Sequence, residues 1–481
     1  MRGLTGDRQR WGLWSAGGED LDEARAVEAC RTPYGDRHVA DVEQATEADV
    51  DVAVDRAAAA WREHRRTPGH VRAGWLRAAA DAFDEQTDVL VDAIVDLLGK
   101  PRGAAAFEVG RGAQLLRLAA EEIARFHGEN LNLDGVAGGE GRWGITRREP
   151  IGVLAAITPF NAPVNLFLQK VAPALAVGNA AVVKPAPEAA VVALQLAELL
   201  SRALPPGLLT ILPGGPEVAL RLAAHPRVGA VSLTGGVAAG EAVLSAAGVK
   251  PVLLELGSNA ANLVCADANL DDAARRIAVA AFGASGQQCI SAQRVIVERP
   301  AVEAFTERFV AAAEQLTVGD PRDPATDIGP LVHERRKQAV LRFVEDAEAQ
   351  GAKLALDGRA DDLCFGPTIV TDAPPESLVC RDEVFGPVAV VIAADDVDHA
   401  VELANDSPFG LQSACFTRDL GTAMRVAENL RSGAVWINES TRFRLDTYPF
   451  GGYGQSGIGR EGVRYAMEAL TYLKFVGLRP A

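Results

Sequence analysis

The chain has 481 residues, a formal net charge of −16 and an apolar content of 48%. This composition is that of a folded globular protein with two or three domains, and it excludes a disordered chain. The negative charge argues against nucleic acid or an anionic membrane surface as the main partner, because phosphate groups are bound by basic patches.

The sequence contains no sign of secretion or membrane insertion. The N-terminus lacks the apolar core of a secretory signal, and no run of about 18 apolar residues predicts a transmembrane helix. The six cysteines form no C-x-x-C pair, which in a chain of this length indicates reduced thiols and a cytoplasmic protein. The seven histidines have no metal-binding spacing, so we expect no metal site.

The first part of the chain is predicted to be helical. Residues 52–61 and 71–83 carry apolar side chains three and four positions apart, with charges between them, as amphipathic helices do. Residues 134–148 are rich in glycine and then polar, which predicts an excursion or a hairpin away from the core.

Short apolar runs alternate with helical segments from residue 150 onward. The predicted strands cover residues 151–158, 180–183, 208–212, 230–233 and 252–256, and the predicted helices cover 166–175, 191–204, 218–224 and 239–247. Such alternation is typical of parallel βαβ units, which bind ligands at the carboxyl ends of their strands.

A second α/β series follows. The predicted helices cover residues 273–282, 302–316 and 334–349, and the predicted strands cover 294–297, 388–392, 434–437 and 472–476. The fold class is therefore α/β.

Two residues suggest a reaction. Cys289 lies in the run Gly-Gln-Gln-Cys-Ile-Ser, and Glu255 ends an apolar strand. A thiol can add to an aldehyde, a hydride then leaves, and a carboxylate can activate the water that hydrolyses the resulting thioester. Each residue alone is more often structural, as a buried thiol or an ion-paired carboxylate.

Two further polar residues follow predicted strands. Asn161 could donate to an oxyanion, although capping of the next helix is the commoner role of such a residue. Lys184 could bind the ribose or phosphate of a cofactor, although most lysines are simply solvated. A G-x-G-x-x-G run at 457–462 follows a Gly-rich loop and not a strand, so we interpret it as a loop and helix start and not as a dinucleotide fingerprint.

Together these runs resemble the aldehyde dehydrogenase superfamily from about residue 45 to about residue 476. The matching motifs occur in the family's order: Thr-Pro-Phe-Asn at 158–161, Val-Lys-Pro at 183–185, Leu-Thr-Gly-Gly at 233–236, Glu-Leu-Gly at 255–257, Glu-Val-Phe-Gly-Pro at 383–387 and Pro-Phe-Gly-Gly at 449–452. The sequence is most similar to the branch that acts on lactaldehyde, phosphonoacetaldehyde and, without phosphorylation, glyceraldehyde 3-phosphate.

The resemblance implies an aldehyde dehydrogenase-like fold in a homodimer or homotetramer. It implies a Rossmann-like cofactor domain at 1–127 and 147–255, a catalytic α/β domain at 256–462, and a small β oligomerisation arm at 128–146 and 463–481. In this family Cys289 corresponds to the nucleophile, Glu255 to the general base and Asn161 to the oxyanion donor.

The resemblance also implies a nicotinamide cofactor. The residues expected on the cofactor side are Thr158, Pro159, Lys184, Glu188, Gly214, Thr234, Gly235, Gly236, Val237, Leu256, Glu383 and Phe385. Gly236 and Ser258 depart from the usual Ser and Gly of the family. We expect NAD more than NADP, because an acidic Glu188 near the ribose would repel a 2′-phosphate.

The expected substrate is a small polar aliphatic aldehyde. The residues expected on the substrate side are Arg111, Gln288, Ile290, Arg444 and Phe450, and Arg442 is a further candidate for binding a polar or anionic head. A phosphonate, phosphate or sulfonate tail remains an alternative. So does a coenzyme A-acylating enzyme, which would not need Glu255, and so does a non-catalytic binding role on an enzyme scaffold.

Overall fold

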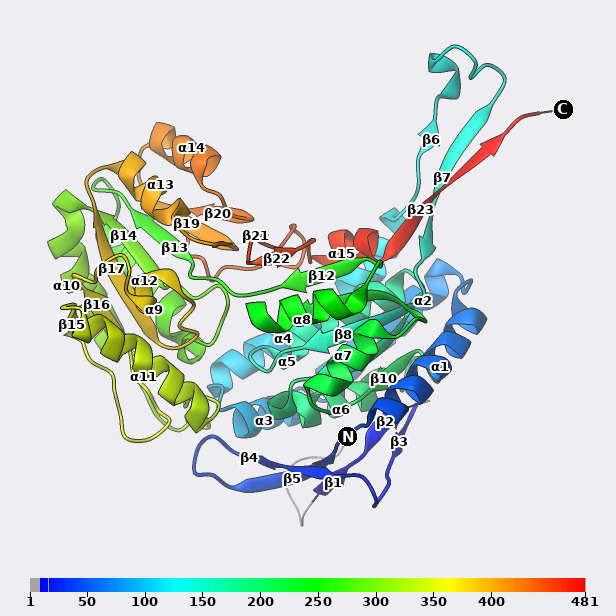
Figure 1. Cartoon of the computed structure of the whole chain (residues 1–481), viewed down its shortest axis with the longest axis horizontal. Coiled ribbons are helices and arrows are strands. Elements are labelled where there is room, and N and C mark those ends of the chain that lie inside the picture. Colours follow the sequence, from blue (N-terminus) through cyan, green and yellow to red (C-terminus); the bar gives the residue numbers. More distant parts are fainter. Residues whose placement is uncertain (1–8, 16, 481) are drawn as a thin grey trace.

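Two large sheets form the body of the molecule (Figure 1). This computed structural model describes residues 9–15 and 17–480, so the first eight residues of the expected cofactor domain lie outside the described part. The expected α/β fold is confirmed. The domain boundaries inferred from the sequence stay a prediction.

The first sheet has eight strands in the order β22-β12-β11-β8-β9-β10-β2-β3. Their bounds are β2 (Leu13–Ser15), β3 (Gly18–Asp20), β8 (Val153–Thr158), β9 (Ala180–Pro185), β10 (Leu209–Ile211), β11 (Val228–Thr234), β12 (Val252–Glu255) and β22 (Gly457–Ile458). The five strands from β12 to β10 are parallel. Helices cover both faces of parallel sheets, which is why these strands are almost continuously apolar.

Eight helices accompany this sheet. They are α1 (Glu47–His64), α2 (Gly69–Glu85), α3 (Thr87–Leu98), α4 (Arg102–Glu122), α5 (Pro163–Ala176), α6 (Ala190–Leu200), α7 (Pro216–Ala224) and α8 (Val237–Ala247). All the strands and helices predicted between residues 151 and 256 are present. The helix predicted over 191–204 ends earlier, at Leu200, and residues 201–203 form turns before Pro205.

The second sheet has seven strands in the order β15-β16-β17-β14-β13-β19-β20. Their bounds are β13 (Ala261–Val264), β14 (Arg294–Glu298), β15 (Lys353–Leu356), β16 (Thr368–Thr371), β17 (Val388–Ala394), β19 (Gln412–Phe416) and β20 (Ala434–Ile437). The helices are α9 (Leu270–Phe282), α10 (Val302–Glu314), α11 (Glu334–Ala349), α12 (Leu378–Arg381), α13 (Val397–Asn405) and α14 (Leu420–Asn429). Short 3-10 helices elsewhere are η1 (Ile123–Arg125), η2 (Leu133–Gly135), η3 (Pro187–Ala189), η4 (Gly283–Gly286) and η5 (Arg299–Ala301).

The glycine run at 457–462 returns the chain to the first sheet. Gly457 of β22 pairs directly with Glu255 of β12, and a Cβ at Gly457 would lie 1.9 Å from the Leu254 carbonyl oxygen. Helix α15 (Val463–Ala469) begins directly after this run, as the sequence predicted. The small sheet of β18 (Phe409–Gly410) and β21 (Tyr453–Gly454) lies in the same region.

A three-stranded sheet projects from the body and ends near the C-terminus (Figure 1). It consists of β6 (Asn130–Leu131), β7 (Trp143–Pro150) and β23 (Thr471–Leu478), so the predicted hairpin at 134–148 is confirmed. Trp143 is 67% exposed, and Tyr472, Leu473 and Phe475 are also exposed. The assignment of this sheet as an oligomerisation arm stays a prediction.

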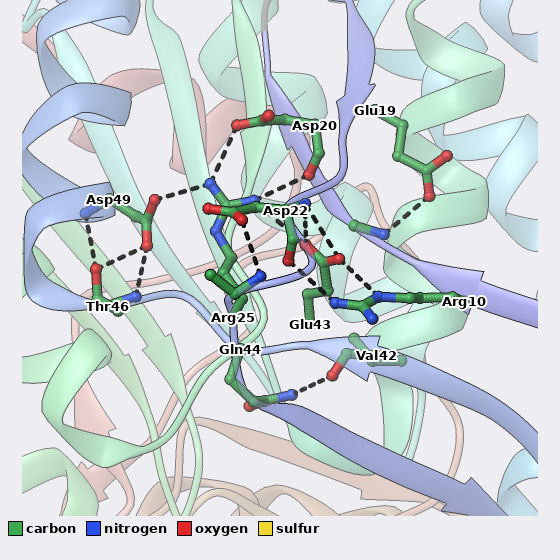
Figure 2. A network of polar contacts seen from close by, with 12 residues as sticks. Arg10, Glu19, Asp20, Asp22, Arg25, Val42, Glu43, Gln44, Thr46 and Asp49 are labelled. Atoms are coloured by element: carbon green, nitrogen blue, oxygen red, sulfur yellow. Dashed lines mark hydrogen bonds and ion pairs between the residues drawn. The ribbon is translucent and has the colours of Figure 1, made fainter.

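The N-terminal strands are held by buried charges that the sequence did not predict. They are β1 (Gln9–Trp11), β4 (Val27–Arg31) and β5 (His38–Glu43). Figure 2 shows the fully buried Glu43 carboxylate between Arg10 and Arg25. Thr46 and Asp49 form a capping box that starts α1 beside this network.

Candidate active site

The predicted cofactor residues meet at one edge of the first sheet. Thr158, Thr234 and Glu255 end strands β8, β11 and β12, and Lys184 lies near the end of β9. Ile157 pairs with Lys184, and Thr234 pairs with Glu255. The loops and turns that follow these strands carry the other expected residues on this edge: Pro159, Glu188, Gly214, Gly235, Gly236, Val237 and Leu256.

Two helix N-termini at this edge suit an anionic cofactor group. Gly214 closely precedes α7, and Gly236 precedes Val237, the first residue of α8. A Cβ at Gly236 would meet nothing within 4 Å, so the space before α8 is open. Free N–H groups and the helix dipole attract phosphate at such a position.

Lys184 also supports the binding of a cofactor at this edge of the sheet. Its side chain is buried, and within the described residues its ammonium group forms no hydrogen bond or ion pair. Burial lowers the pKa of Lys184, although Glu188 and other carboxylates oppose this effect. A buried cation without a protein partner fits the ribose hydroxyl or phosphate groups of a dinucleotide.

Glu188 lies in η3, four residues after Lys184 in the chain. Its carboxylate is 3.5 Å from the Nε2 atom of His333. Burial opposes ionisation of Glu188, but the hydrogen bond from His333, a backbone hydrogen bond and the charges of His333 and Lys184 together outweigh it and hold the pKa below its ordinary value. Glu188 is therefore negatively charged at neutral pH.

A loop from the second sheet reaches the same edge. Glu383 and Phe385 lie between α12 and β17, and the Ser258 N–H donates to the Glu383 carboxylate over 3.0 Å. Burial raises the pKa of Glu383 to about 7, against the effect of that hydrogen bond. Phe385 contacts Phe160 edge-on, with 6.0 Å between the ring centres.

A tight backbone contact positions the loop that carries Cys289. Residues 284–286 after α9 all have positive φ angles, including +64° at Gly286. A Cβ at Gly286 would lie only 2.1 Å from the Gly386 carbonyl oxygen. The loop that carries Cys289 therefore packs directly on the backbone that follows Phe385, with no side chain between them.

Asn161 lies beside the loop that carries Cys289. Its side-chain nitrogen donates to the Gln287 carbonyl oxygen over 2.9 Å, and its own backbone carbonyl accepts from Lys100 over 2.6 Å. Burial, and then the charge of Glu383, raise the pKa of the Cys289 thiol to about 12. The thiol is therefore protonated at neutral pH in this state of the protein.

A cavity of about 560 Å³ opens onto Cys289 and Asn161. The predicted residues Arg111, Gln288, Ile290 and Arg444 line it, together with the connecting segment 439–445. Phe450 is fully buried, is absent from the cavity wall, and supports the Arg444 guanidinium at 3.6 Å from its ring centre.

Four cations line this cavity, and three of them are neutralised by carboxylates. Lys100 pairs with Glu108, Arg111 with Asp446, and Arg444 with Glu461. Arg442 forms no ion pair within the described residues, and it donates only to the Val279 carbonyl oxygen over 2.9 Å. Arg442 is thus the cation of the wall that keeps an uncompensated charge.

Glu255 is a buried carboxylate with one oxygen that accepts no hydrogen bond in the described part of the chain. Burial, and then the negative charge of Glu461, raise its pKa well above the ordinary value. Glu461 accepts from Lys170 over 2.7 Å and from Arg444 over 2.8 Å. These two cations outweigh the effect of burial and hold the pKa of Glu461 below its usual range.

The sequence did not identify five residues of this charged network: Lys100, Glu108, Lys170, Asp446 and Glu461. One of them carried a usable signal. Lys170 occurs in α5, where every residue is buried, and a lysine in such an apolar helix indicates a buried ion pair. The others lie in polar contexts, and only the fold brings them together.

The structure contains no group of three or more His, Cys, Asp or Glu side chains suited to a metal within residues 9–15 and 17–480. In the same residues, no helix has both the length and the apolar character needed to span a membrane.

Comparisons with known proteins show which family the chain resembles. Residues 22–476 match the profile of the aldehyde dehydrogenase family. A 3-sulfolactaldehyde dehydrogenase of Priestia aryabhattai is 38% identical over 99% of this chain and 100% of its own length. A lactaldehyde dehydrogenase of Methanocaldococcus jannaschii is 35% identical over 92% of this chain and 96% of its own.

A solved structure has the same overall fold. The NADP-dependent glyceraldehyde-3-phosphate dehydrogenase of Bacillus halodurans, solved with NADP, superimposes with a TM-score of 0.96. It is 31% identical, and the match covers 98% of this chain and 100% of that one.

Proposed function

The chain belongs to the aldehyde dehydrogenase family and is an NAD(P)-dependent aldehyde dehydrogenase, and we propose that it oxidises a short polar aldehyde with a singly charged anionic tail. The product is the carboxylic acid, formed through a thioester on Cys289. The observation that carries this proposal is the unpaired Arg442 in the wall of the cavity.

Each residue has a chemical role in this proposal. Glu255 takes the proton of the Cys289 thiol and passes it to water, the sulfur bonds to the aldehyde carbon, and the Asn161 amide and the Cys289 N–H donate to the developing oxyanion. When bound, the nicotinamide cofactor supplies the acceptor for the hydride that leaves the same carbon. Glu255 then takes a proton from water, the water oxygen bonds to the thioester carbon, and the Cys289 thiolate leaves.

Hydrolysis is favoured over acyl transfer to coenzyme A because of Glu255. Its raised pKa brings the carboxyl group closer to the range in which a general base works at physiological pH. Its free oxygen is an available acceptor for a water proton. Adding coenzyme A should therefore give no acyl-coenzyme A product, and accumulation of that product would contradict the assignment.

The charge balance of the cavity supports an anionic tail. Arg442 offers one uncompensated positive charge, which matches one sulfonate or carboxylate group. The 3-sulfolactaldehyde named for a relative carries such a sulfonate. A doubly charged phosphate would leave one negative charge without a partner, so we place it second.

The test compares an anionic aldehyde with a neutral one in the variant Arg442→Met. We expect kcat/KM for 3-sulfolactaldehyde to fall by about 10- to 100-fold, as for loss of a charged hydrogen bond. The value for lactaldehyde should change less than about threefold. The matched control is Arg425→Met, which changes a half-exposed surface arginine that pairs with Asp398. Equal losses on both aldehydes would overturn the tail assignment.

We also propose NAD as the preferred cofactor. The ionised Glu188 lies beside Lys184 at the carboxyl end of β9, where a ribose would bind. A 2′-phosphate would meet its negative charge. Steady-state kinetics with both cofactors test this, and Glu188→Gln should shift the preference toward NADP. A wild-type enzyme that prefers NADP would refute the assignment.

A further inference from the structure

We infer that Asn165 is a specificity-determining residue whose side-chain amide binds a hydroxyl group on the carbon next to the substrate's aldehyde. The inference rests on the proposed oxidation at Cys289, and it concerns a different part of the substrate from the charged tail. Asn165 lies in the cavity wall and has no role in the cofactor binding or the covalent chemistry proposed above.

Asn165 is a buried polar residue without a polar partner for its side chain. It lies in the first turn of α5, is 5% exposed and lines the cavity beside Cys289 and Asn161. Its side-chain oxygen is buried without a hydrogen bond. Its side-chain nitrogen donates none within residues 9–15 and 17–480, and the contact of Asn165 with Glu108 comes from its backbone N–H.

The two neighbouring amides at this spacing are engaged. Asn161 precedes the helix, and Gln169 lies one turn after Asn165 on α5, so three amide residues follow one another at intervals of four in the chain. Asn161 donates to the Gln287 carbonyl, and Gln169 donates to Asp446. Asn165 is the member of this row whose nitrogen and oxygen both lack a protein partner.

No structural role of Asn165 explains why an amide side chain occupies this position in α5. Asparagine is a weak helix former, and an unpaired buried amide is unfavourable compared with a leucine of similar shape. It is not the cap of α5, because Ala162 precedes the helix and no side chain caps it. An unsatisfied polar group in a cavity wall is instead suited to a ligand that supplies the missing partner.

The position of Asn165 indicates which part of the substrate it meets. Asn161 is expected at the aldehyde oxygen, and Asn165 lines the same cavity from the first turn of α5. We therefore expect Asn165 to meet a substituent on the carbon next to the reacting carbonyl. An amide both donates and accepts, as a hydroxyl group does, so the two groups match without any charge.

The experiment uses two aldehydes that differ only in this hydroxyl group, lactaldehyde and propanal. The wild-type enzyme should have a higher kcat/KM for lactaldehyde. In Asn165→Leu, the value for lactaldehyde should fall about tenfold, the size expected for one lost neutral hydrogen bond, while the value for propanal stays within about twofold. Asn165→Ala should show the same selective loss if leucine perturbs the cavity.

The matched control is Asn429→Leu, an exposed asparagine on α14. It should leave both aldehydes unaffected. Equal losses on both aldehydes in Asn165→Leu would assign Asn165 a positioning role for the oxyanion donor and overturn the inference. A wild type without preference for lactaldehyde would overturn it too.

The proposed charged tail is tested independently. If Arg442 does not recognise a tail, Arg442→Met causes no selective loss of kcat/KM for 3-sulfolactaldehyde. The comparison of lactaldehyde with propanal remains measurable on any active enzyme. Melting temperatures separate folding from recognition, because Asn165→Leu removes an unpaired buried group and should not destabilise the protein.

Discussion

Glu255 and Glu461 are two buried carboxylates of one site whose pKa values are displaced in opposite directions. Burial and the charge of Glu461 raise the pKa of Glu255. Two cations, Lys170 and Arg444, overcome burial and lower that of Glu461. One carboxylate is therefore held as a permanent anion, and it makes the other one the stronger base.

Replacing Glu461 should change the pH dependence of turnover. A general base works only when it is deprotonated, so kcat rises as the pH increases through the pKa of Glu255. Glu461→Gln removes the nearby negative charge and leaves Lys170 and Arg444 uncompensated, and both changes favour ionised Glu255. The acidic limb of the kcat profile should therefore move to lower pH.

The control for this profile is Glu468→Gln. Glu468 lies in α15, which follows Glu461 closely, and it forms a partly exposed pair with Arg464, 3.2 Å apart. Its replacement should leave the acidic limb in place. A limb that stays fixed or moves to higher pH in Glu461→Gln would show that the two carboxylates are not coupled as described.

The Cys289 thiol should react slowly in the free enzyme. Because its pKa is raised to about 12 by burial and by Glu383, little thiolate exists at neutral pH. The rate of alkylation by iodoacetamide should rise about tenfold for each pH unit from about pH 7 to 10, without a plateau. Mass spectrometry of the peptide that contains Cys289 follows this reaction.

Glu383→Gln should speed that alkylation above pH 7. The pKa of Glu383 is raised to about 7 by burial, so it carries its charge above that pH and disfavours the thiolate. The exposed Glu376 provides the control, since Glu376→Gln should have no effect. An alkylation plateau near neutral pH would refute the raised pKa of the thiol.

The buried pair Lys100–Glu108 should stabilise the fold by holding the backbone from Asn161 to Val164. Lys100 donates to the Asn161 carbonyl, and Glu108 accepts from the Val164 N–H at the start of α5. Glu108→Gln leaves a buried ammonium without a counter-charge and should cost about 3–5 kcal/mol in unfolding free energy. Denaturant titration measures the loss.

A double-mutant cycle with Lys100→Met completes this test. The double variant should be more stable than the sum of the two single losses, because no unpaired charge remains. The exposed pair Lys353–Asp372, 3.0 Å apart, should give a coupling below about 1 kcal/mol. Additive losses at positions 100 and 108 would contradict the buried-pair account.

Gly286 should tolerate no side chain. Gly286→Ala places a Cβ against the Gly386 carbonyl oxygen and forces a positive φ on alanine, so we expect more than about tenfold loss of kcat and a lower melting temperature. Gly351→Ala is the matched control, because Gly351 also has a positive φ but open space around it. Equal effects of both changes would show that backbone strain, and not the contact with Gly386, is responsible.

The sequence predicted the parallel strands well, because their apolar runs are buried on both faces and carry a strong pattern. The same pattern located Glu255 and Lys184, which interrupt or end such runs. It could not locate the partner of Arg111, because Asp446 is 335 residues away and only the fold joins them. Short strands such as β1 and β4 were missed because few apolar residues mark them.

The roles of individual cations also depended on the fold. Arg442 and Arg444 are two residues apart and look equivalent in the sequence. In the structure Arg444 is bound to Glu461 and packed on Phe450, whereas Arg442 lacks a carboxylate. Sequence spacing predicted that arginines would line the cavity but gave no information on which charge is already compensated.

The connecting segment 439–445 lines the cavity, while Cys289, Asn161 and Glu255 are fixed by strand ends and by packed backbone. The reacting groups and Arg442, the residue proposed to bind the charged tail, are thus carried by separate parts of the chain. Substitutions in one short loop can alter the accepted aldehyde without moving the nucleophile or the base. Such a division lets a lineage acquire new substrates by small steps, and it marks this loop as the place to begin when the enzyme is redesigned.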